Sequence, residues 1–105
     1  MKPKVEIDAD EVRETLERLR EQGAFPEKPV IKRFEVVPDY DSTGDPAYYI
    51  SVLLDDATPD EDLVRDKVKP IERLVFDSVV RGPDEPWPYV RIVREREHLA
   101  PVEEW

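Results

Sequence analysis

One apolar run constrains the fold of this chain more than any other feature. Residues 50–54, Ile-Ser-Val-Leu-Leu, lie within a longer segment, 47–54, that is rich in aromatic and β-branched side chains and follows a stretch dense in turn formers. Such a segment is typical of a β-strand. A disordered chain would lack apolar runs of this kind, so we expect a folded protein. Residues 30–37 and 87–95 have the same character and predict two further strands.

Two other segments repeat their apolar residues every three or four positions, as an amphipathic helix does. The first follows Asp8, a residue type that caps helix N-termini, and stops at Gly23, which suits the turn after a helix. The second starts with Thr58 as its cap and continues to about Val80. Pro70 lies inside this second segment and predicts a kink or two abutting helices, because proline removes a backbone hydrogen bond.

The resulting order is α-β-β-α-β in a single domain of 105 residues. Helices that each bury one stripe need one face of a sheet to cover. The sequence therefore predicts an α+β two-layer sandwich, with a three-stranded, mainly antiparallel sheet and both helices on one face. A right-handed crossover through the second helix would place the third strand beside the first. Residues 1–7 are expected to form an extended lead-in, and residues 96–105 a C-terminal tail.

Charge narrows the possible partners. The chain has a net charge of −10, spread along its length. A diffuse negative field opposes binding to nucleic acid and to anionic membranes, and favours solubility and a basic protein partner. The absence of cysteine excludes disulfides and thiolate metal sites. No apolar run approaches the ~20 residues of a membrane span, and the start lacks a signal-peptide pattern, so the expected location is the cytoplasm.

The sheet face turned away from the helices is the candidate functional surface. Side chains alternate along strands, so the helix-facing set of the second strand is Tyr48, Ile50, Val52 and Leu54. The opposite face would be unusually apolar and aromatic, and an uncovered patch of that kind usually marks an interaction surface. The alternatives are that the tail from His98 to Trp105 folds back over it, or that scattered apolar residues are simply exposed. This face is predicted to carry Ile31, Arg33, Glu35, Val37, Tyr49, Ser51, Leu53, Tyr89, Arg91 and Val93. The predicted partner-binding residues are Tyr49, Leu53, Tyr89, Arg91, Val93 and, as an extra anchor, Trp105.

Motifs for catalysis or metal binding are weak. Residues 39–45, Asp-Tyr-Asp-Ser-Thr-Gly-Asp, look like the first half of a calcium loop, but Ile50 stands where a bidentate glutamate is needed. A hairpin loop that uses Asp and Gly for its backbone conformation explains the same residues. The chain has no nucleophile elbow and no phosphate-binding glycine loop. We therefore predict a protein that is not an enzyme, with no catalytic residue, no metal site and no cofactor.

A competing interpretation concerns nucleic acid. Trp87 and Tyr89 could stack on bases, and the arginines that follow, Arg91, Arg94 and Arg96, could clamp a single strand. Alternatively, the aromatic side chains fill the sheet's edge and the arginines pair with neighbouring acids. The net negative charge favours this second interpretation.

Two resemblances bear on function. The α-β-β-α-β order with an interrupted second helix resembles the layout of type II KH domains, but the Gly-x-x-Gly loop and basic face of that family are absent. No RNA-binding residue is therefore carried over from that family. The alternative function is a KH-like nucleic-acid-binding module that uses the strand with Trp87, Tyr89 and Arg91. The hairpin 41–47, Asp-Ser-Thr-Gly-Asp-Pro-Ala, and the Trp-Pro-Tyr strand are similar to those of small prokaryotic proteins encoded in short operons with a companion protein. That resemblance implies a partner-binding role of the antitoxin or accessory kind.

Together these observations predict a non-enzymatic protein-interaction or accessory protein. It would form a homodimer or bind a companion protein through the second face of the sheet.

Overall fold

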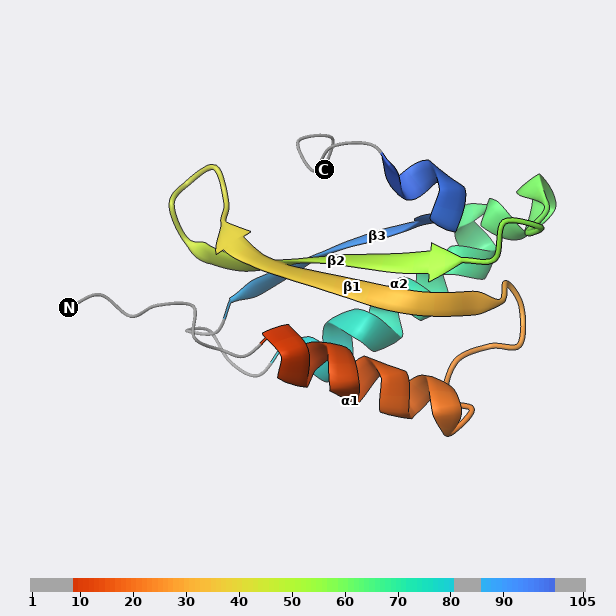
Figure 1. The fold of residues 1–105 in the computed structure, drawn as a ribbon, viewed down its shortest axis with the longest axis horizontal. Helices are drawn as coiled ribbons and strands as arrows, with labels where there is room; N and C mark the ends of the chain where they lie inside the picture. The colour runs from red at the N-terminus through yellow and green to blue at the C-terminus, as the bar shows by residue number, and fades with distance from the viewer. Residues whose placement is uncertain (1–8, 81–85, 100–105) are drawn as a thin grey trace.

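The computed structural model describes residues 9–80 and 86–99 of the chain, with residues 98 and 99 described by their backbone alone. The elements are α1 (Ala9–Glu21), β1 (Ile31–Tyr40), β2 (Pro46–Leu54), the 3₁₀ helix η1 (Asp60–Leu63), α2 (Arg65–Val79), β3 (Trp87–Arg94) and the 3₁₀ helix η2 (Glu95–Leu99). Both α-helices lie on the same side of the sheet, and η2 lies on the other (Figure 1). The predicted α+β class and the order α-β-β-α-β are confirmed. No helix among the described residues is long and apolar enough to cross a membrane.

The strand order differs from the predicted one. The sheet runs β1-β2-β3, with β1 antiparallel and β3 parallel to β2, so the sheet is mixed. The prediction that the third strand lies beside the first is wrong. The central position goes to β2, where five consecutive residues from Ile50 to Leu54 are buried. Burial on both faces and both edges suits the most apolar strand of the chain.

The first helix ends as the sequence predicts. Gly23 has a φ of +77°, a conformation that glycine adopts without a steric penalty. The Gly23 N–H donates to the Arg20 carbonyl over 3.1 Å, and the Ala24 N–H donates to the Leu19 carbonyl over 3.0 Å. This pair of bonds is the Schellman motif, which satisfies carbonyl groups at the end of a helix. The predicted cap, Asp8, lies outside the described residues.

The second helical segment is interrupted at Val64, not at Pro70. Val64 is extended, with φ −73° and ψ 158°, and separates η1 from α2. Thr58 is not a side-chain cap as predicted, because its hydroxyl donates to the Asp55 carbonyl over 2.6 Å. The helix α2 continues through Pro70. Proline there costs one hydrogen bond, to the carbonyl four residues earlier, which a helix packed on a sheet tolerates.

The core fills the space between the two helices and the sheet. Leu16 of α1 and Ile71 of α2 are buried against β1 and β2. The predicted helix-facing set of β2 is confirmed: Tyr48, Ile50, Val52 and Leu54 all belong to this core. Ile31 also belongs to it, although the alternation along β1 predicts the opposite face. A register irregularity between Ile31 and Arg33 is the cause, since one extra residue reverses the direction of the side chains before it.

The helix η2 is tied to the second face of the sheet. It contacts both β2 and β3. Nε of Arg33 on β1 donates to the Glu95 carboxylate over 2.8 Å, and this bond is the main reason why the pKa of Arg33 is raised. The buried Arg94 joins three segments, because its guanidinium donates to the Thr58 carbonyl and to the carboxylates of Asp60 and Glu97. Part of the predicted C-terminal tail is therefore folded structure.

Candidate protein-interaction site

The second face of the sheet is only partly open. Leu53, which the sequence predicts on the binding surface, is completely buried, and Ser51 is 2% exposed, so Leu53 offers no surface to a partner in this conformation. Leu53 pairs with Val93 near the end of β3, and η2, which follows β3 directly, contacts both β2 and β3. Val93 and Arg91 are half-buried. Trp105 lies outside the described residues. The accessible part of the predicted surface is thus the end of the sheet that bears Tyr49 and Tyr89.

Tyr49 and Tyr89 form one aromatic step across β2 and β3. They are register partners, and their rings stack with centroids 5.3 Å apart and planes inclined by 14°. Tyr89 remains 38% exposed, and Val37, the partner of Tyr49 on β1, is also exposed. Stacked tyrosines offer rigid contact area together with a polar tip, a combination common in interfaces.

The tip of the β1–β2 hairpin, residues 41–45, is joined to the tyrosine step by a hydrogen bond to Tyr89. One carboxylate oxygen of Asp41, Oδ1, accepts bonds from the Thr43 N–H, the Thr43 hydroxyl and the Asp45 N–H. The other, Oδ2, accepts a 3.2 Å bond from the Tyr89 hydroxyl. The bond from the Thr43 hydroxyl contributes most to the lowered pKa of Asp41. For Tyr89, loss of hydration contributes most to its raised pKa, followed by the bond to Asp41.

The loop therefore uses its carboxylates for its own hydrogen bonds. Gly44 has a φ of +87° and donates its N–H to the Asp41 carbonyl over 2.9 Å, which closes a turn that ends on a residue with a positive φ. This is the common geometry of a hairpin with a three-residue loop. Within the described residues, no group of three or more acidic, histidine or cysteine side chains is placed to hold a metal ion.

A groove lies between α2 and β3, next to the tyrosine step. Its volume is about 600 Å³. The lining residues come from α2 (Lys69, Glu72, Arg73, Phe76 and Asp77) and from β3 (Trp87, Pro88, Tyr89 and Val90). Phe76 meets Trp87 edge to face, with centroids 5.0 Å apart and planes inclined by 73°. Trp87 is nevertheless 51% exposed, so one aromatic surface is held rigid and left open to solvent.

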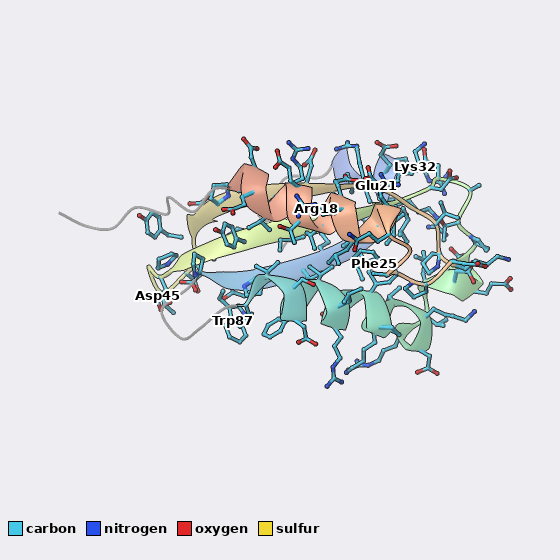
Figure 2. All side chains as sticks on the ribbon, turned by 90° about the horizontal axis from the view of Figure 1, so that it is seen from below. Arg18, Glu21, Phe25, Lys32, Asp45 and Trp87 are labelled. Carbon is cyan, nitrogen blue, oxygen red and sulfur yellow. The ribbon has the colours of Figure 1, made fainter. Side chains whose placement is uncertain are left out.

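Charged side chains line the groove at both ends. Lys69 and Arg73 come from the earlier turns of α2, and Asp77 from its last turn, close to where β3 begins with Trp87. Asp45 of the hairpin lies at the same end of the molecule as Trp87 (Figure 2). Both Asp77 and Asp45 are exposed. An exposed acid, Asp77, therefore lies at the Trp87 end of the groove, while the other end carries Lys69 and Arg73 together with the acid Glu72.

The arginines proposed to hold nucleic acid do not form a basic track. Arg94 is buried, and its guanidinium binds Thr58, Asp60 and Glu97 as described above. Arg91 is half-buried on the second face of the sheet. Arg96 is exposed, but it stands beyond the end of β3, far along the strand from Trp87.

Sequence reasoning brought Trp87 and Tyr89 forward but missed Phe76 and the groove. A signal was present, because the buried residues of α2 (Ile71, Val75 and Val79) repeat at steps of four and Phe76 falls beside that stripe. A large aromatic side chain next to the buried stripe of an amphipathic helix indicates a second contact surface. The partner of Phe76 could not be found without knowing that β3 lies at the sheet's edge above α2.

No protein-family model matches the chain, and no curated protein or solved structure matches it either.

Proposed function

We propose that this protein is a non-enzymatic interaction protein that binds a partner polypeptide in the groove between α2 and β3. The observation that carries the proposal is the aromatic pair of Phe76 and Trp87, in which Trp87 is half exposed although its ring is fixed by an edge-to-face contact. Exposed, ordered tryptophan is costly in water and is enriched among the residues that dominate binding energy at interfaces.

The surroundings of this pair fit the same role. The groove has the size of pockets that hold a few side chains of a ligand, and an apolar floor rimmed by charges, as interaction sites have. Tyr89 belongs both to the groove and to the tyrosine step with Tyr49, so one continuous aromatic surface extends around the β3 edge. In this proposal the partner is a companion protein or a second copy of the chain, and the role is an accessory one in the cytoplasm.

Site-specific photo-crosslinking in living cells tests the proposal. A photoreactive phenylalanine analogue replaces Arg73, an exposed residue on the groove wall, and in a control protein it replaces Val30. Val30 is 52% exposed and precedes β1 at the opposite end of the sheet from Trp87. We expect a discrete crosslinked polypeptide from position 73 that position 30 does not give. The same products from both positions, or none from position 73, would refute the proposal.

Binding to nucleic acid is tested in parallel. Fluorescence anisotropy with single-stranded DNA and RNA at low salt should show no groove-dependent binding, because the chain has a net charge of −10 and a negative field opposes contact with phosphates. Binding that is lost in Trp87→Ala and weakens steeply with salt would instead favour the KH-like alternative that uses Trp87, Tyr89 and Arg91.

A further inference from the structure

The two outer edges of the sheet differ, and the edge of β1 is obstructed at Phe34, at Pro38 and at its start. The Phe34 N–H donates to Oε2 of Glu17 on α1 over 3.3 Å, so this backbone group points away from β2 and is already satisfied. Arg20 holds the same carboxylate in place through bonds of 2.8 and 3.0 Å. Pro38 lies four residues after Phe34, so its backbone also points away from β2, and proline has no N–H group to donate. A register irregularity between Ile31 and Arg33 distorts the start of the strand. Such features block the addition of another strand.

The edge of β3 is closed only at its ends. The Arg94 N–H donates to Glu97 over 3.2 Å instead of to β2, which shows that Arg94 points its backbone outwards. Because backbone direction alternates along a regularly paired strand, Pro88, Val90 and Ile92 point outwards as well. Pro88 lacks an N–H, which is tolerated on an edge. Among the described residues no strand pairs with β3 on this side, so Val90 and Ile92 present their N–H and C=O groups.

The groove lies where the side chains of an added strand would go. Half of those side chains would point towards α2, and the groove there is lined by Phe76 from the helix and by Trp87 and Val90 from β3. An apolar side chain of the incoming strand would fill this space. Main-chain bonds to the edge and alternate side chains in a groove are the two components of recognition by strand addition.

The net charge of the chain indicates what kind of strand would be added to the β3 edge. The chain carries a net charge of −10, so a second copy of it would be repelled and a basic segment attracted. At the Trp87 end, the exposed acid Asp77 lines the groove together with the accessible indole ring, and the exposed Asp45 of the hairpin lies at the same end of the molecule. An arginine or lysine placed there would meet both a carboxylate and an aromatic face, which attract cations.

We propose that the groove receives an extended, basic segment of a different protein, which pairs with the free edge of β3 at Val90 and Ile92 and places a cationic side chain at Trp87. This rests on the proposed function and specifies the mode of binding and the chemistry of the partner.

Peptide selection on the full chain tests this proposal. A display library of short linear random peptides is selected for binding, with Trp87→Ala as the counter-selection protein. Tyr40→Ala serves as the matched control, since Tyr40 is 43% exposed but does not line the groove. We expect cationic peptides with alternating apolar residues. Their affinity should fall about tenfold in Trp87→Ala and stay within about twofold in Tyr40→Ala, with both variants equally folded by circular dichroism. N-methylation of alternate backbone amides of the peptide should also weaken binding by about tenfold.

Amide hydrogen exchange gives a readout of strand pairing itself. In the free chain the Val90 and Ile92 amides should exchange fast and those of Tyr89 and Arg91, which point towards β2, slowly. The selected peptide should protect Val90 and Ile92.

Peptides that bind in the groove without protecting them, and that tolerate N-methylation, would overturn strand addition and leave the proposed function standing. Acidic selected peptides would overturn the basic partner. A doubled mass by light scattering, with Val90 and Ile92 protected in the free chain, would show that a second copy occupies the edge. Recovery of no peptide that depends on Trp87 overturns the proposal, and the crosslink from position 73 decides the proposed function separately.

Discussion

Replacement of Leu53 by alanine tests the assignment of this residue to the interior. The alternation of the sequence gives Leu53 and Val37 the same face of the sheet, yet Leu53 is 0% exposed and Val37 is 40% exposed. Leu53→Ala should therefore destabilise the protein strongly, whereas Val37→Ala, the matched control on the same face, should have little effect.

The magnitude follows from the burial of the side chain. Leu53→Ala removes three carbon atoms from a fully buried site, which at about 0.8 kcal/mol per buried methylene is a loss of about 2.4 kcal/mol. The space left behind raises the loss to about 3 kcal/mol, within the range of ~2–5 kcal/mol for such substitutions. A domain of this size has a free energy of unfolding of about 5–15 kcal/mol, so the variant should still fold. Val37→Ala should cost less than about 1 kcal/mol.

Urea unfolding followed by circular dichroism measures both changes. With a denaturant dependence of about 1–3 kcal/mol per molar, Leu53→Ala should lower the midpoint by ~1–3 M, while the slope stays unchanged. A loss below about 1 kcal/mol for Leu53→Ala, or equal losses for both variants, would show that Leu53 is on the surface. Leu53 would then be available to a partner, as the alternation of the sequence predicts.

Two further predictions concern the hairpin tip. Gly44→Ala should reduce stability by about 1 kcal/mol through its positive φ of +87° alone, since no atom lies within 4 Å of the added methyl group; a loss above ~3 kcal/mol in urea unfolding would contradict this. Asp41→Asn should lower the pKa of Tyr89 from its raised value towards 10.0, because the bond to Asp41 is one of its causes, and NMR titration of labelled tyrosine rings measures the shift. In the folded chain the pKa of Asp41 is lowered. The contribution of this carboxylate to stability is therefore complete above pH 3.8 and is lost as the pH falls through the folded pKa. An acid-unfolding curve that is the same for Asp41→Asn would disprove this contribution.

The parts of the fold that depend on local patterns could be predicted from the sequence. The alternation of Tyr48, Ile50, Val52 and Leu54 identified the core side of β2, because a strand's side chains repeat with a period of two. Gly23 marked the end of α1 for an equally local reason, its left-handed conformation. These features need no information about which elements become neighbours.

The features that could not be predicted from the sequence depend on single-residue irregularities or on contacts between residues far apart in the chain. The irregular register before Arg33 moved Ile31 to the core, and nothing in the local alternation signals an extra residue. The burial of Leu53 also depends on its surroundings in the folded chain, not on its own strand. For the candidate site, Trp87 and Tyr89 were visible as a dense aromatic spot, but the groove required the position of β3 next to α2.

The parallel pairing of β2 with β3 also determines when the groove can exist. Each residue of β2 from Ala47 to Leu54 pairs with a residue forty positions later, whereas only residues 41–45 separate β1 from β2. Closing the longer loop costs more chain entropy, so we expect the hairpin to form early in folding and β3 to dock late. The proposed binding at the β3 edge would therefore require a completely folded chain, because a partially folded chain has the hairpin but not the groove.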